Sequence, residues 1–75
     1  MTIFVFTLGD RLRKARRSAG LSSADLAERI GVSRNTVSNY ENGRVKPRRA
    51  ALRRWAEVTG LSLDELLGEY GQDAA

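Results

Sequence analysis

Four side chains that can form hydrogen bonds with the edges of DNA bases fall within one short polar stretch of this 75-residue chain. They are Arg34, Asn35, Ser38 and Asn39. A guanidinium can donate to O6 and N7 of guanine, and a carboxamide can pair with N6 and N7 of adenine, each for about 1–3 kcal/mol of discrimination. On a helix that buries Val37, Tyr40 and Glu41, the four side chains lie on the outer side. We therefore expect the arginine and the two asparagines to read bases, with the serine as a weaker fourth contact.

An ordinary solvated helix face is the competing interpretation of this stretch. Solvated faces usually carry Glu and Lys, because these residues have a higher helix propensity than Asn and Ser. The composition of residues 34–42 therefore favours a recognition role.

Two short helices joined by a tight turn must position these side chains. Ser22 and Asp25 have a capping-box-like spacing, which predicts a helix that begins at Ser22 and ends just before Gly31. Ser33 caps the second helix, which carries the polar stretch. The small side chain of Ala27 lets the two helices approach closely where they cross. The pair has the form of a helix-turn-helix, whose second helix enters the DNA major groove.

Two longer helices flank this pair in the prediction. Thr7 and Asp10 mark the start of the first, which Gly20 ends. Its apolar stripe consists of Leu8, Leu12, Ala15 and Ala19. The other helix runs to Thr59, and we expect Pro47 to occupy its first position because proline fits the first helical turn.

A fifth helix opens at a second capping box, formed by Ser62 and Glu65. The predicted organisation is then an N-terminal arm over residues 1–6, an all-α domain over 7–67 and a polar tail over 68–75 that frays.

The pattern L-S-x-x-x-L-A-x-x-x-G-V-S-x-x-T-V-S-x-Y-E-N-G, residues 21–43, resembles the XRE or phage-repressor family of helix-turn-helix proteins, which is lambda-repressor-like or Cro-like. The resemblance extends over residues 8–67. It implies a five-helix, all-α, lambda-repressor-like domain, here with a short extended N-terminal arm. It also implies a sequence-specific transcriptional regulator, a repressor, that binds a near-palindromic double-stranded DNA operator as a homodimer through helix 34–42.

The resemblance also implies roles for residues outside the recognition helix. Arg16 and Glu41 would form an ion pair that joins the first helix to the end of the recognition helix and aims Arg16 toward the phosphates; two unrelated surface charges are the alternative. Ser23 stands where the family usually carries a glutamine that clamps the backbone, so Ser22 and Ser23 would offer a shorter contact at a helix N-terminus. Phosphate or minor-groove contacts are implied for Asn42, Arg44, Lys46, Arg48 and Arg49.

The charge distribution agrees with a polyanionic partner on one face. Residues 11–54 contain all 13 basic side chains and only three acidic ones, whereas residues 55–75 contain five acidic side chains and no basic one. The absence of cysteine and histidine from the sequence excludes disulfides, thiol nucleophiles, imidazole bases and the common zinc sites. We therefore expect no enzyme activity, no metal and no cofactor.

The N-terminal arm has the composition of a strand, because residues 2–6 are mostly β-branched or aromatic. We expect Ile3, Phe4, Val5 and Phe6 to contact a second molecule in a dimer. Two alternatives stay open: the arm covers the domain's own surface around the fifth helix, or the dimer uses the leucines of that helix, Leu63, Leu66 and Leu67. Residues 1–8 are too short to span a bilayer, so we expect no membrane contact and a cytoplasmic protein.

Two other functions remain as alternatives on the same fold. One is a protein-interaction module, for which an acidic or apolar recognition face would be the sign. The other is a protein that binds nucleic acid without regard to sequence.

Overall fold

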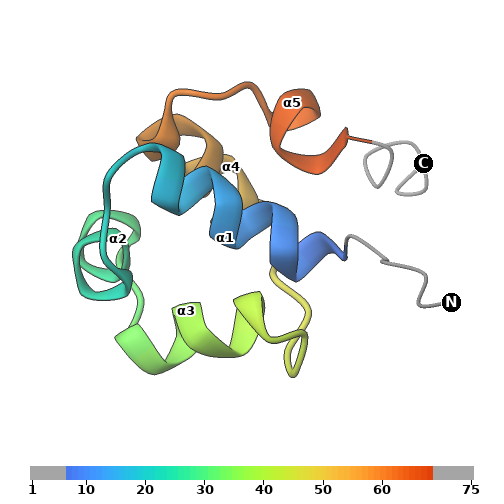
Figure 1. Cartoon of the computed structure of the whole chain (residues 1–75). Coiled ribbons are helices and arrows are strands. Elements are labelled where there is room, and N and C mark those ends of the chain that lie inside the picture. Colours follow the sequence, from blue (N-terminus) through green and yellow to red (C-terminus); the bar gives the residue numbers. More distant parts are fainter. Residues whose placement is uncertain (1–6, 69–75) are drawn as a thin grey trace, which may run out of the picture.

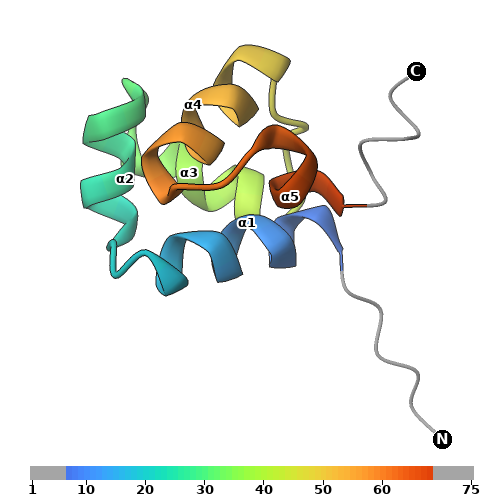
Figure 2. The same ribbon diagram turned by 90° about the horizontal axis from the view of Figure 1, so that it is seen from above.

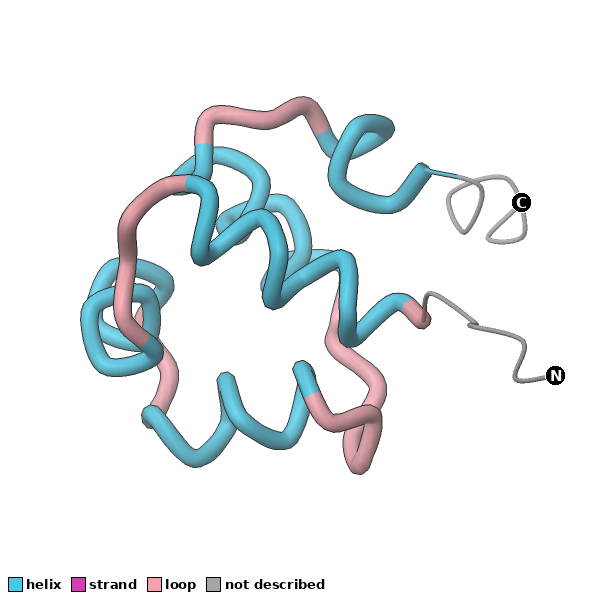
Figure 3. The backbone as a smooth tube through the Cα atoms, viewed as in Figure 1, coloured by secondary structure: helices cyan, strands magenta, loops and turns pink. Residues whose placement is uncertain are grey.

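A computed structural model describes residues 7–68 of the chain, and all the regular structure in this range is helical. The five helices are α1 (Leu8–Ser18), α2 (Ser23–Ile30), α3 (Arg34–Glu41), α4 (Arg49–Thr59) and α5 (Leu63–Leu67). Figure 1 shows α1 between α3 on one side and α5 on the other, and Figure 2 shows from above that α5 lies beside α1. Short loops connect the helices, as the backbone trace in Figure 3 shows. The expected all-α, five-helix fold is confirmed.

Three helices begin at the capping boxes that the sequence indicates. Thr7 with Asp10 opens α1, Ser22 with Asp25 opens α2, and Ser62 with Glu65 opens α5. In each case the cap hydroxyl accepts from the backbone N–H three residues on, while the acidic side chain accepts from the cap's own N–H. These bonds form within one turn, so they depend on local sequence.

The core is built around Trp55 of α4, which is fully buried. Its indole Nε1 donates to the backbone oxygen of Leu12 at 3.1 Å, so the one polar atom of the side chain has a partner. The other fully buried large side chains are Leu12, Leu26, Val37 and Leu66. They come from α1, α2, α3 and α5, so a single cluster joins all five helices around the tryptophan.

The helices α1 and α3 meet most closely at Gly9. A Cβ atom at this position would overlap the carbonyl oxygen of Glu41 and lie 2.8 Å from its carbonyl carbon. Because glycine has no Cβ, the first turn of α1 can lie directly on the C-terminal end of α3. This approach was not predicted; Ala27, which was predicted to be a close contact, is buried as well.

The start of α4 corrects one expectation. Pro47 does not occupy the first helical position, because the helix begins at Arg49 with Arg48 as its N-cap, and Arg48 makes no side-chain capping bond. Pro47 is buried one residue before the cap, and Leu52 is buried four residues after it. Apolar residues at these two positions are those that a hydrophobic staple uses, so burial decides the entry of the chain into α4.

Two further expectations change. Ala19 is the C-cap of α1 and is exposed, so the apolar stripe of this helix ends at Ala15. Leu66 and Leu67 are 1% and 4% exposed in the domain's own core, so of the three leucines expected at a dimer contact through α5 the half-buried Leu63 has the most surface to offer. The predicted arm contacts at residues 3–6, and nearly all of the predicted tail, lie outside the described residues.

Candidate nucleic-acid interface

A tight turn sets α3 across α2. Gly31 ends α2 with φ of 79°, a left-handed conformation that glycine adopts without a Cβ penalty. The hydroxyl of Ser33 then accepts from the backbone N–H of Thr36 at 3.1 Å and starts α3. Val37, on the inner side of α3, is fully buried, and Val32 in the turn packs against the core. The rotation of α3 about its axis is therefore fixed by burial on its inner side.

The outer side of α3 carries Arg34, Asn35 and Ser38, and all three are exposed. They line an open hollow of about 570 Å³ together with Ser23, the first residue of α2. The structure therefore brings three of the four predicted base-reading residues to one surface. Ser22 lies beside this surface, with its hydroxyl engaged as the cap of α2.

Asn39 occupies a different flank of α3. It is half-buried and lines a second hollow, of about 620 Å³, with Val45 and Lys46 among its neighbours. Its backbone oxygen accepts from the N–H groups of Arg44 at 3.0 Å and Val45 at 3.4 Å, so it also anchors the loop that follows. The predicted group is thus divided between two hollows, with Asn39 about 40° around the helix axis from Asn35 and about 100° from Ser38.

An ion pair of short distances joins α1 to the end of α3. Arg16 donates from Nε to Oε2 of Glu41 at 2.7 Å and from Nη2 to Oε1 at 3.1 Å. Its Nη1 donates to the backbone oxygen of Leu21 at 3.0 Å. The hydrogen bonds that Arg16 donates to Glu41 raise the pKa of Arg16, so the guanidinium stays charged although the residue is buried.

This geometry shows the ion pair expected of Arg16 and Glu41. The residue is 9% exposed and each of its three guanidinium nitrogens already donates to a protein oxygen. The arginine therefore holds α1 and α3 together, and its contact with phosphates stays a prediction.

Arg13 is a member of the same cluster that the sequence prediction missed. Its Nη2 donates to Oδ1 of Asn42 at 3.0 Å, and its Nε lies 3.5 Å from Oε1 of Glu41. Asn42 is the C-cap of α3, so Arg13 fixes the amide that follows the recognition helix. The spacing of Arg13 and Arg16, nearly one helical turn, is the signal that could have indicated it.

The loop between α3 and α4 places its cations in solvent. Arg44, Lys46, Arg48 and Arg49 are all exposed. Val45 is 48% exposed and is the large hydrophobic residue that residues 7–68 leave most open to solvent. The loop therefore extends the polar surface of α3 with positive charge.

The model of the helix-turn-helix domain family matches residues 7–67, which is most of the chain. The chain belongs to this family. The XRE-like identity expected from residues 21–43 is confirmed, because the similar proteins are named as regulators of the helix-turn-helix type.

Three relatives illustrate the family. The transcriptional regulator ImmR of Bacillus subtilis is 35% identical over 63 residues, which is 84% of this chain and 50% of ImmR. The prophage-derived regulator YonR of the same organism is 36% identical over 65 residues, 85% of this chain and 60% of YonR. The cryptic phage CTXphi repressor RstR of Vibrio cholerae is 31% identical over 64 residues, 85% of this chain and 57% of RstR. This helix-turn-helix chain thus spans about half to three fifths of these relatives.

Between residues 7 and 68, no three acidic side chains gather closely enough to hold a metal ion. In the same range no helix has the length and apolarity needed to cross a bilayer.

Proposed function

We propose that this chain is a sequence-specific, DNA-binding transcriptional repressor that reads the major groove with α3. The observation that carries the proposal is the outer surface of α3, where Arg34, Asn35 and Ser38 are exposed together while Val37 and Glu41 are held in the fold. An α-helix with its side chains is about 10–12 Å in diameter. The major groove of B-DNA is about 12 Å wide and accepts such a helix.

The relatives support the same function. ImmR and YonR are named as transcriptional regulators, and RstR as a transcriptional repressor. Fold likeness alone does not carry a function, so the proposal depends on this chain's own polar surface. A repressor acts by binding its operator, so this function needs no catalysed reaction. In a bacterium the DNA lies in the cytoplasm, so the protein would act there.

The exposed cations flanking α3 would supply the phosphate contacts. They are Arg44, Lys46, Arg48 and Arg49, with Asn42 at the end of α3 and Ser22 and Ser23 at the start of α2. Phosphate contacts fix the position of a protein on the duplex but carry no sequence information. In this arrangement they orient the domain so that the side chains of α3, including Asn39 on its other flank, meet the base edges.

Two copies would read a near-palindromic operator as a homodimer. A two-fold axis places two recognition helices about 34 Å apart, one turn of DNA, and repeats the same half-site on each strand. The number of base pairs read is then roughly doubled.

Selection of bound sites from a random DNA pool tests this function. We expect one enriched sequence with inverted half-sites, bound at least about 1,000-fold more tightly than scrambled DNA at the same salt concentration. A protein that packages DNA without regard to sequence would enrich no site and would bind both duplexes equally. A protein-interaction module would bind neither duplex. Either result would overturn the proposal.

A further inference from the structure

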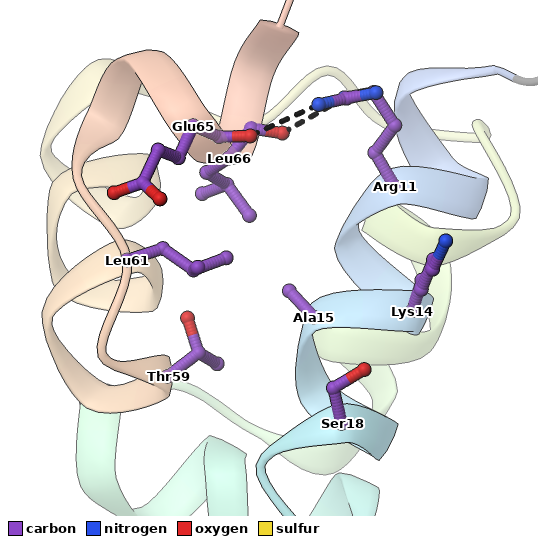
Figure 4. Close-up of a pocket in the computed structure, with 8 residues that line it drawn as sticks. All are labelled: Arg11, Lys14, Ala15, Ser18, Thr59, Leu61, Glu65 and Leu66. Carbon is purple, nitrogen blue, oxygen red and sulfur yellow. Dashed lines mark hydrogen bonds between the residues drawn. The ribbon is translucent and has the colours of Figure 1, made fainter.

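A groove lies between α1 and α5, apart from the surface described above. Its apolar lining consists of the half-buried Leu61 with Ala15 and Leu66, which are 6% and 1% exposed, and its volume is about 300 Å³, the lower end of the range for ligand sites. Figure 4 shows Leu61 pointing across toward α1, where Ala15 faces it, and Leu66 pointing from α5 toward Leu61. The groove therefore has room for one or two apolar side chains.

The two ends of the groove differ. At the end nearer the start of α1, Arg11 donates from Nε to the backbone oxygen of Leu66 at 3.0 Å and from Nη2 to that of Glu65 at 2.9 Å. Figure 4 shows this side chain reaching across from α1 to α5. At the far end lie Ser18 and Thr59, and within residues 7–68 no hydrogen bond joins these two across the groove. Arg11 thus closes one end, and the other end is open.

The groove faces away from α3. Arg11, Ala15 and Ser18 follow the spacing i, i+4, i+7 and share one face of α1. Gly9 and Arg16, which contact the end of α3, fall on the opposite face of the same helix. A segment bound in the groove would leave the outer surface of α3 accessible.

We propose that this groove binds residues 3–6 of a second copy of the chain, so that two molecules exchange their N-terminal segments. These residues are Ile, Phe, Val and Phe, four apolar side chains in succession directly before the cap of α1. Fully extended, six residues span at most about 20 Å, which is enough to cross from one domain into the groove of another. Burial of a large apolar side chain is favourable by about 1.5–3 kcal/mol in general, so both copies gain from the exchange.

The closed end of the groove is the reason that the segment enters a second copy and not its own domain. The chain reaches Thr7 from the N-terminal side of α1, and on that side Arg11 bridges α1 to α5. To reach the open end at Ser18, a chain entering its own groove would have to reverse direction within residues 1–6. These residues include no Gly, Pro, Asn, Asp or Ser, the types that dominate tight turns. The β-branched Ile3 and Val5 favour an extended chain instead.

Exchange between two identical molecules is reciprocal. Under two-fold symmetry each copy gives its segment and receives the other's, so both grooves are filled. The inference rests on the homodimer of the proposed function and names its contact. Its test uses no DNA, so a failed exchange and a failed DNA recognition are separate results.

Introduced cysteines test the exchange directly, because the chain has none of its own. One protein carries a cysteine at residue 3, 4, 5 or 6 in turn, and a second protein of different mass carries Ser18→Cys. After mixing and mild oxidation we expect a disulfide between the two different chains for at least one of the four positions. In the matched control, Ala24→Cys replaces Ser18→Cys. Ala24 is exposed on α2, away from the groove, so this variant should give no cross-link.

Sedimentation gives the second measurement. The full chain of 8.3 kDa should sediment as a dimer, and a variant that starts at Thr7 should sediment as a monomer, at slightly less than half the mass of that dimer. Ser18→Trp, which fills the open end of the groove, should have the same effect while retaining its helical circular dichroism. An unchanged dimer after truncation would overturn the exchange. A disulfide formed only within one chain, in a Phe4→Cys, Ser18→Cys double variant, would overturn it as well.

Discussion

Glu41 at the end of α3 receives two hydrogen bonds from the guanidinium of Arg16 on α1, with nitrogen–oxygen distances of 2.7 and 3.1 Å. Both side chains are almost completely buried, at 11% and 5% exposure. The Nε of Arg13 lies 3.5 Å from the same carboxylate, and its Nη2 donates a hydrogen bond to Oδ1 of Asn42. The orientation of the recognition helix therefore depends on a sheltered charge cluster as well as on apolar packing.

Glu41→Ala should destabilise the fold strongly. The substitution leaves the buried guanidinium of Arg16 without its partner, and breaking such pairs costs about 3–5 kcal/mol. Urea unfolding measures the difference. Glu28→Ala is the control, because this glutamate is exposed on α2 and its loss should change stability by less than about 0.5 kcal/mol. Equal stability of the two variants would mean that the ion pair contributes nothing.

Gly9→Ala should destabilise the domain although alanine is the better helix former. An added Cβ would overlap the carbonyl oxygen of Glu41, so α1 must move away from α3. Overpacking of this kind costs about 1–3 kcal/mol, more than the gain of up to about 1 kcal/mol in helix propensity. Thermal unfolding checks the sign. Gly43→Ala is the comparison, because that position has positive φ but open space around it. A higher melting temperature for Gly9→Ala would refute the close approach.

Arg34→Ala should weaken binding to the selected DNA site by about 1–3 kcal/mol and relax the preference at one base pair. The reason is the exposed position of Arg34 on the first turn of α3. Affinity for scrambled DNA should change far less. Arg44→Ala is the matched comparison, because a phosphate contact should weaken both duplexes alike. If Arg34→Ala also weakened both alike, Arg34 would be a phosphate contact.

Neutralising the loop cations should reduce the salt dependence of binding. Each phosphate contact contributes about 0.9 to the slope of log K against log salt concentration. Single alanine variants of Arg44, Lys46, Arg48 and Arg49 should therefore lower the slope by about one each, measured by fluorescence anisotropy across a salt series. Arg53→Ala, one turn farther along α4, should leave the slope unchanged. Four unchanged slopes would place the loop away from DNA.

Stability should fall in acid partly through Glu65. Its pKa is lowered by hydrogen bonds from the backbone and the side chain of Ser62, so the folded protein binds this proton less readily than the unfolded chain. The contribution is present above the unfolded pKa of about 4.3 and is lost as pH falls through the lower folded value. Denaturant unfolding from pH 6 to pH 2.5 should show a shallower acid loss for Glu65→Gln. Identical pH profiles would exclude a role for this cap.

The local features of the domain follow from its sequence. Each local feature involves residues that are at most about one helical turn apart in the sequence. Examples are the capping boxes at Ser22 and Ser62, the glycine turn at Gly31 and the burial of Val37. Within such distances the backbone geometry of a helix leaves few arrangements. The same reasoning placed Arg34, Asn35 and Ser38 on one exposed side of α3. It misplaced Pro47, because the entry of α4 is decided by what the loop buries.

Only the tertiary structure decided the contacts between residues far apart in the chain. Three contacts join residues that are 29 to 55 positions apart in the sequence. They are the close approach of Gly9 to Glu41, the hydrogen bond from Arg13 to Asn42 and the bridge from Arg11 to Leu66 across the α1–α5 groove. No periodicity records such pairs, because they depend on the angle and the distance at which whole helices pack. Arg16 illustrates the difference. Its partner could be named from the sequence resemblance, but only the packed structure removes it from the surface and assigns it to holding α1 against α3.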